Sequence, residues 1–186
     1  MKILVGVSNR HCHLTEDTYV QLFGNNKLEK HKDLVQPGEF ASTSKIIIKK
    51  GDREIKEVRV LGPFRDYDQV EISKTDAYKL KINPPVRRSG DLLNSETVAL
   101  IGPRGMGILT EGVIIANRHI HFSIDDAKKF GVEDNQLINV KVGGIKGGSM
   151  HVRAKIQNPS VIELHIDTDD ANSFLLTTGD EVEADI

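Results

Sequence analysis

The 186-residue sequence is poor in cysteine, in long apolar runs and in charge of one sign. Its single cysteine, Cys12, excludes an internal disulfide and a cysteine-rich zinc site, so nothing requires an oxidising compartment. No segment approaches the roughly 18 to 20 apolar residues that span a bilayer, so no membrane partner is expected. The apolar run from Met1 to Val7 is too short for a secretory signal and predicts a first β-strand.

The charges nearly cancel, with 25 Lys and Arg against 27 Asp and Glu. This balance gives no electrostatic reason to expect nucleic acid as a partner. A content of 38% hydrophobic and 28% charged residues is typical of a globular protein with a real core, and it excludes a disordered or fibrous chain. We expect a cytoplasmic protein, or one enclosed in another reducing compartment.

Short apolar runs separated by turn signals predict a mainly β chain. The expected strands after the first are 45–49, 55–61, 69–72, 97–101, 113–116, 137–142, 150–156 and 161–166. Convincing helices do not alternate with them, which favours antiparallel barrels over a doubly wound sheet. Three short helices are predicted, over 15–23, 74–80 and 123–130, the first and third capped by Thr15 and Ser123. The polar stretch 24–44 is predicted to be a mobile loop.

An internal repeat is the most informative feature of the sequence. Residues 7–15 align without gaps on residues 115–123, and both copies contain Asn-Arg-His-x-His between an apolar strand and a short helix. A weaker echo pairs Val60-Leu61-Gly62-Pro63 with Leu100-Ile101-Gly102-Pro103. The sequence therefore predicts two related half-units whose histidine motifs meet at one shared site.

The His-x-His spacing suits metal binding. Side chains at i and i+2 of a strand share a face about 6.5 to 7 Å apart, so two imidazoles can bind one ion. A single pair is weak support, since packed or surface histidines are the alternative, but two copies in matching contexts favour ligands. These candidates are His11, His13, His119 and His121.

Two further candidate ligands are less distinctive. Alternation in Ile162-Glu163-Leu164-His165-Ile166-Asp167 places His165 on a polar face, where a solvent-exposed histidine is the alternative. Glu71, between Val70 and Ile72, is either a carboxylate ligand or an ordinary outward-facing strand residue. The pattern alone leaves both open.

The sequence resembles the phosphate propanoyltransferases, the PduL-type phosphotransacylases, over nearly its whole length. The motifs that carry the resemblance are Val7 to Leu14, Leu61-Gly62-Pro63, Gln69 to Ser73, Pro84 to Arg87, Ser89-Gly90-Asp91, Glu111 to Ala116, His119-Ile120-His121 and Leu164 to Asp169 with Ala171-Asn172. Cys12 between two candidate ligands and Arg88 after Arg87 depart slightly from the family pattern.

The resemblance implies two intertwined β-barrels with short capping helices. Residues 1–9 and 117–186 would form one barrel and residues 10–116 the other, with a polar loop near 24–44 and the active site between the barrels. It also implies two zinc ions per chain, one held by His11, His13 and Glu71 and the other by His119, His121 and His165.

The activity implied is reversible transfer of a propanoyl or acetyl group between coenzyme A and inorganic phosphate, which makes acyl-CoA and phosphate the partners. Arg65 would bind phosphate as the catalytic residue. Coenzyme A would contact Asn9, Arg10, His11, Arg87 and Asn172. By their residue types alone, Arg10 and Arg118 either contact a ligand or hold a barrel junction together, and Asn9 is equally a turn residue.

The resemblance is also consistent with a homodimer, and with propanediol degradation inside a bacterial microcompartment if an N-terminal extension exists. Here the first motif starts within ten residues of Met1, which favours a cytoplasmic member or a chain from which such an extension has been trimmed. A cupin lacks the duplicated motif, and an amidohydrolase barrel needs about 250 residues. The remaining alternative is a non-enzymatic, cupin-like barrel that binds a metal or another ligand.

Overall fold

A computed structural model describes all 186 residues and contains fourteen strands and four short helices. The predicted mainly β architecture of two barrels with short helices is confirmed. The chain divides into two compact units, residues 1–9 with 117–186 and residues 10–116, which we call barrel 1 and barrel 2. None of the helices has the length and apolar character needed to cross a membrane.

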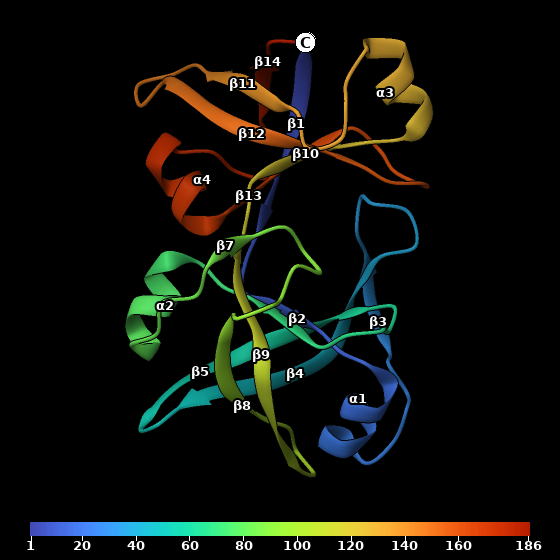
Figure 1. Ribbon diagram of the computed structural model, residues 1–186, viewed down its shortest axis with the longest axis vertical. Helices are drawn as coiled ribbons and strands as arrows, with labels where there is room; N and C mark the ends of the chain where they lie inside the picture. The colour runs from blue at the N-terminus through green and yellow to red at the C-terminus, as the bar shows by residue number, and fades with distance from the viewer. The chain divides into compact units, whose positions relative to one another are not determined.

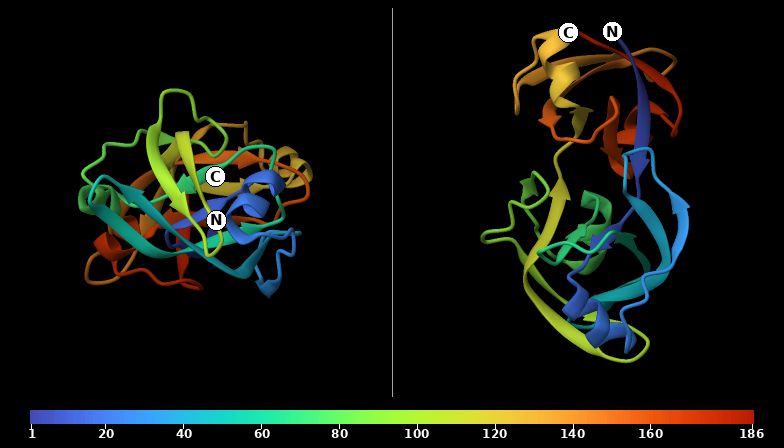
Figure 2. Two further views of the ribbon diagram at one scale, coloured as in Figure 1. Left: turned by 90° about the horizontal axis from the view of Figure 1, so that it is seen from below. Right: turned by 90° about the vertical axis from the view of Figure 1, so that its right-hand side faces the viewer.

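Barrel 1 is a closed ring of six strands in the order β1-β13-β10-β12-β11-β14 (Figure 1). Their bounds are Lys2–Ser8 (β1), His119–Phe122 (β10), Leu137–Val142 (β11), Gly148–Ile156 (β12), Glu163–Asp167 (β13) and Glu181–Ala184 (β14). Helices α3 (Ile124–Phe130) and α4 (Thr168–Phe174) belong to this unit. The two ends of the chain lie side by side, with the amino group of Met1 donating to the Ala184 carbonyl at 2.6 Å (Figure 2).

Barrel 2 contains eight strands and the helices α1 (Glu16–Phe23) and α2 (Lys74–Leu80). Its strands are His11–His13 (β2), Lys30–Asp33 (β3), Phe40–Lys50 (β4), Arg53–Gly62 (β5), Gln69–Glu71 (β6), Val86–Arg87 (β7), Glu96–Ile101 (β8) and Met106–Ala116 (β9). Six of them close a ring in the order β9-β6-β2-β5-β4-β8. The other two pair with members of the ring, β3 with β4 and β7 with β9.

The two rings have the same topology. Strands β9, β6, β2, β5, β4 and β8 of barrel 2 correspond in order to β1, β13, β10, β12, β11 and β14 of barrel 1, and each neighbouring pair has the same parallel or antiparallel sense in both rings. The repeat seen in the sequence at the histidine motifs therefore extends over both barrels. Each barrel has its own apolar core.

Alternating apolar residues explain the strands. On β11, Ile138, Val140 and Val142 are buried and the residues between them are not, which is the pattern of a strand with one face on a core. Thr15 and Ser123 cap α1 and α3 by accepting backbone N–H groups, as predicted, and both helices end at a glycine with positive φ.

Several elements differ from the sequence expectations, and the short strands β2, β7 and β10 are also absent from the expected set. Each ring contains two parallel strand pairs, so the barrels are mixed and not antiparallel as expected. The segment 24–44 is not a continuous loop, because β3 forms over Lys30–Asp33 and β4 begins at Phe40. Helix α4 was not expected, and Asp167 caps it by accepting the backbone N–H groups of Asp169 and Asp170. Strand β14 was also missed, although its pairing with β1 and β11 closes barrel 1.

Candidate metal centres and anion site

The first cluster lies in barrel 2, where β2 carries His11 and His13 and β6 carries Glu71. The strands are antiparallel with His11 opposite Glu71, so the three side chains share one face. All three are buried, and the Nε2 atom of His11 lies 3.4 Å from Oε2 of Glu71. One possible ligand atom from each residue lies within 4.8 Å of the others. The structure thus brings together the first predicted set of ligands.

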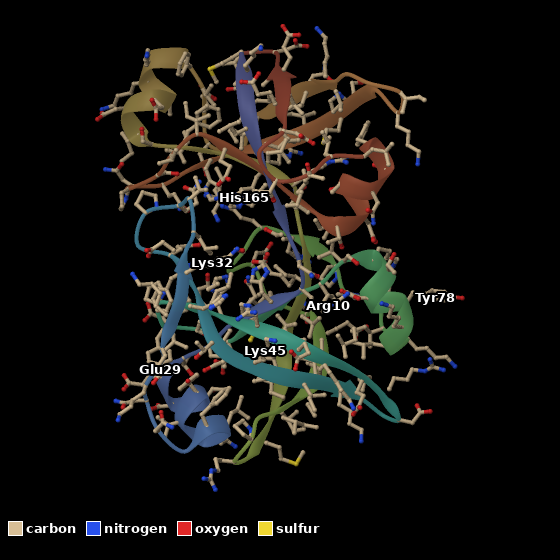
Figure 3. The ribbon with its side chains drawn as sticks, turned by 180° about the vertical axis from the view of Figure 1, so that it is seen from behind. Arg10, Glu29, Lys32, Lys45, Tyr78 and His165 are labelled. Carbon is tan, nitrogen blue, oxygen red and sulfur yellow. The ribbon has the colours of Figure 1, made fainter.

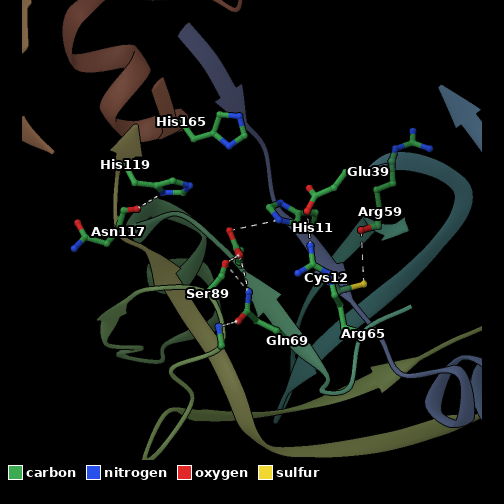
Figure 4. A network of polar contacts seen from close by, with 12 residues as sticks. His11, Cys12, Glu39, Arg59, Arg65, Gln69, Ser89, Asn117, His119 and His165 are labelled. Atoms are coloured by element: carbon green, nitrogen blue, oxygen red, sulfur yellow. Dashed lines mark hydrogen bonds and ion pairs between the residues drawn. The ribbon is translucent and has the colours of Figure 1, made fainter. Parts of the chain in front are cut away.

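Two neighbours that the sequence analysis did not identify hold Glu71 in place (Figure 4). Gln69 is buried, and its Nε2 donates to Glu71 Oε1 at 2.6 Å. The hydroxyl of Ser89 donates to the same oxygen at 2.5 Å. These contacts connect strand β6 to the loop that contains Ser89, which lies 18 residues further along the chain.

The second cluster lies in barrel 1, where β10 carries His119 and His121 and β13 carries His165. The antiparallel register places His119 opposite His165, as His11 lies opposite Glu71 in barrel 2. The Nε2 atom of His121 lies 3.1 Å from Nε2 of His119 and 3.2 Å from Nδ1 of His165. The structure thus brings together the second predicted set.

Two oxygen atoms determine which nitrogens of this cluster carry hydrogen. The Nδ1 of His119 lies 2.7 Å from the Asn117 carbonyl oxygen, and the Nε2 of His165 lies 2.7 Å from Oε2 of Glu163. Because a carbonyl or carboxylate oxygen only accepts, these nitrogens donate. The lone pairs of His119 Nε2 and His165 Nδ1 therefore face His121.

Both clusters fit a divalent metal such as zinc. Zinc prefers imidazole and carboxylate ligands at about 2.0 to 2.2 Å, which in tetrahedral geometry separates ligand nitrogens by about 3.3 Å. The nitrogen separations of 3.1 and 3.2 Å in the second cluster are close to this value. The acceptors behind His119 and His165 are the kind of support that metal-binding histidines require.

Arg65, the predicted phosphate ligand, lies just after β5. Its backbone N–H donates to the Leu14 carbonyl at 3.0 Å, and its Nη2 lies 2.5 Å from Oε1 of Glu39, the residue before β4. Figure 4 shows this pair beside His11. Both side chains are about a quarter exposed, at 29% and 24%, so the guanidinium remains accessible to an anion from solution.

The repeated arginines both bind an aspartate of a short helix. Arg10 makes a bidentate pair with the buried Asp76 of α2, at 2.7 and 2.8 Å, which raises the pKa of the guanidinium (Figure 3). Arg118 donates to Asp170 of α4 at 2.9 Å and to the His151 carbonyl at 2.8 Å. Each arginine thus links the segment before a histidine strand to a short helix of its own barrel, and ligand contact by either one stays a prediction.

The other predicted coenzyme A residues lie at the surface. Asn9 and Asn172 are exposed, the latter on α4. Arg87 on β7 is half-buried, with its Nε 3.8 Å from an oxygen of Asp91.

Cys12 does not face the cluster between whose members it stands in the sequence. Its side chain is fully buried in the core of barrel 2, on the opposite face of β2 from His11 and His13, and its thiol donates to the Arg59 carbonyl at 3.6 Å. Burial raises the pKa of the thiol, so the nucleophilic thiolate is strongly disfavoured.

Comparison with known proteins identifies the family of this chain. The family model of phosphate propanoyltransferase matches residues 4–177. A phosphate propanoyltransferase of Thermotoga maritima is 44% identical over 183 residues, covering 97% of this chain and 87% of the relative. One from Lachnoclostridium phytofermentans is 45% identical over 178 residues, covering 94% and 83%. The chain therefore belongs to the phosphate propanoyltransferase family.

Proposed function

We propose that the protein transfers a short acyl group reversibly between coenzyme A and inorganic phosphate, using two zinc ions. The family match over residues 4–177 carries this proposal. The relatives are named phosphate propanoyltransferases, which supports propanoyl as the acyl group, and acetyl is the smaller alternative.

In the proposed reaction, an oxygen of phosphate attacks the carbonyl carbon of the acyl-CoA thioester. The new C–O bond gives an acyl phosphate, the C–S bond breaks, and coenzyme A leaves as a thiolate that takes up a proton. The attack is direct and involves no acyl-enzyme. The buried thiol of Cys12, with its raised pKa, supports this route because it is a poor nucleophile.

Arg65 binds the phosphate in this proposal. Its planar guanidinium matches two phosphate oxygens and offsets the charge that would otherwise repel a second anionic substrate. Its backbone N–H donates to the carbonyl of Leu14, the residue that follows β2. This hydrogen bond holds the backbone of Arg65 next to the end of the strand that carries His11 and His13. Holding the nucleophile in one orientation supplies much of the acceleration in a two-substrate reaction.

The metals would be held by His11, His13 and Glu71 in barrel 2, and by His119, His121 and His165 in barrel 1. A bound zinc ion supplies Lewis acidity, which polarises a thioester oxygen or favours the thiolate form of a departing sulfur. Burial of the first three ligands limits their hydration and keeps them oriented.

Coenzyme A would be bound at Asn9, Arg10, His11, Arg87 and Asn172. Exposure of Asn9 and Asn172 supports contacts with a ligand arriving from solution. Arg10 pairs with Asp76, so its contribution is to position the start of β2 beside the ligand.

The test is acyl-CoA formation from coenzyme A and propanoyl phosphate or acetyl phosphate, measured in metal-loaded protein and after chelation. We expect turnover with metal, its loss on chelation, and its return when zinc is restored. In the direction that consumes acyl-CoA and phosphate, Arg65→Lys should reduce kcat/KM for phosphate by about 10²-fold, because lysine lacks the bidentate fork of the guanidinium. A metal-loaded protein that gives no coenzyme A-dependent turnover would support the non-enzymatic alternative instead.

A further inference from the structure

Equivalent positions in the two barrels carry the residues behind Glu71 and His165. Gln69 precedes Glu71 by two residues on β6, and Glu163 precedes His165 by two residues on β13. Side chains two apart on a strand share a face, so each lies beside its ligand. The registers agree as well, because Gln69 is opposite His13 and Glu163 is opposite His121.

The orientation of Gln69 is fixed from both ends of its amide. Its Oε1 accepts the Gly90 backbone N–H at 2.8 Å, which directs Nε2 toward Glu71, 2.6 Å away. Since Ser89 donates to the same oxygen, Oε1 of Glu71 receives two hydrogen bonds. The oxygen that faces His11 is Oε2.

Glu163 has the opposite hydrogen-bonding role. It accepts from Nε2 of His165, so the hydrogen of the neutral imidazole is on Nε2 and the lone pair is on Nδ1, toward His121. Glu163 also lies against Gly6 of strand β1. Any side chain at position 6 would clash, because its Cβ would lie only 2.8 Å from Oε1 of Glu163 and 3.0 Å from Cδ2 of His165. A glycine at this position leaves room for both side chains.

The hydrogen-bonding character of each supporting residue thus matches its ligand. A carboxylate ligand has a donor behind it in barrel 2, and an imidazole ligand has an acceptor behind it in barrel 1. Resting on the metal centres of the proposed function, we propose that Gln69 and Glu163 are positioning residues. They select Oε2 of Glu71 and Nδ1 of His165 as the atoms that bind metal.

The experiment measures zinc affinity by competition with a chromophoric chelator, and the visible absorption of the cobalt-substituted protein. Gln69→Met and Glu163→Met keep side-chain length but remove the donor and the acceptor. Gln69→Met should lower the zinc affinity of the barrel 2 site, and Glu163→Met that of the barrel 1 site, each about 10- to 100-fold, which is the usual effect of losing such a partner. The zinc affinity of the other site should not change in either variant. The cobalt spectrum of the affected site should change, which a general loss of stability would not produce.

A conservative variant separates positioning from simple packing. Glu163→Gln retains an oxygen that can accept from Nε2 of His165, so its affinity should return to within a few-fold of the wild type. Ser89→Ala removes the second donor to Glu71 Oε1 and provides the test in barrel 2 if Gln69→Met does not fold. Ser42→Ala is the matched control, since it deletes a buried hydroxyl that donates to the Val60 carbonyl at 2.7 Å.

The inference would be overturned if Glu163→Met and the barrel 2 variant that folds, Gln69→Met or Ser89→Ala, both kept the zinc affinities and cobalt spectrum of the wild type. A wild-type protein that binds neither zinc nor cobalt would overturn both this inference and the metal-dependent part of the proposed function. Normal metal binding without turnover in the wild type would contradict only the proposed function.

Discussion

Glu39 binds the guanidinium that the proposed function assigns to phosphate, with its Oε1 2.5 Å from Nη2 of Arg65. A carboxylate resembles one face of a phosphate, so the two compete for the same donors. A partly exposed pair of this kind is worth about 0.5–1 kcal/mol. We therefore expect Glu39→Gln to lower the KM for phosphate about two- to fivefold, measured by initial rates at saturating acyl-CoA.

Glu29→Gln is the control, because it removes one negative charge from an exposed side chain of the same barrel. An unchanged or higher KM in Glu39→Gln would mean that Glu39 orients Arg65 and does not compete with phosphate.

Cys12→Ala should retain kcat. The thiol is in the core and faces away from the histidines of its own strand, so the substitution removes packing and leaves the proposed metal ligands in place. The small cavity should cost about 1 kcal/mol of stability, visible as a lower Tm. Loss of turnover with normal metal content would instead indicate a covalent role for the thiol.

Metal stoichiometry should follow the two clusters. We expect elemental analysis to find two zinc ions in the wild type, and one each in His13→Ala and His119→Ala. His151→Ala should retain two, because this exposed histidine of β12 belongs to neither cluster. Zinc should also raise the Tm of the wild type, since binding to the folded state alone adds about 2.7 kcal/mol at 100 times the Kd. Two ions in His119→Ala would contradict the assignment.

Asp170 should make stability depend on pH. Burial is the main cause that raises the pKa of this carboxyl, outweighing the opposing effect of Arg118. A carboxyl with a raised folded-state pKa binds its proton more tightly when folded, so its contribution is most favourable in acid. That contribution is lost as the pH rises from the unfolded value, near 3.8, through the folded pKa.

The Asp170→Asn variant has no carboxyl at this position, so it does not lose stability in this way as the pH rises. The Tm of metal-free Asp170→Asn relative to wild type should therefore increase between pH 4 and pH 7. A difference that stays constant or decreases with pH would show that the interaction with Arg118 outweighs the effect of burial.

The fold class and the family could be predicted because the repeated Asn-Arg-His-x-His is short, local and chemically distinctive. Alternating apolar residues also located strands such as β11 and β12. Strand β14 was missed because only four residues form it, and α4 because Asp, Asn and Ser favour helices weakly. The capping aspartate, Asp167, was the signal that could have revealed α4.

The supporting residues of the site were harder to predict. Gln69, Ser89 and Glu39 reach their partners through strand pairing and through loops distant in sequence, and no local pattern marks such contacts. Alignment of Gln69 to Ala77 with Glu163 to Ala171, which the registers require, would have placed Glu71 and His165 in equivalent positions. Their roles as metal ligands remain predictions.

Closure of barrel 1 by β1 has a consequence for the order of folding during synthesis. Residues 10–116 contain every strand of barrel 2, so this unit can close while the rest of the chain is still being made. Strand β1 is synthesised first, yet its partners β13 and β14 come last, and Met1 bonds to a residue 183 positions away. Until then Ile3 and Val5 have no core, and β1 is an unpaired strand that is open to mispairing.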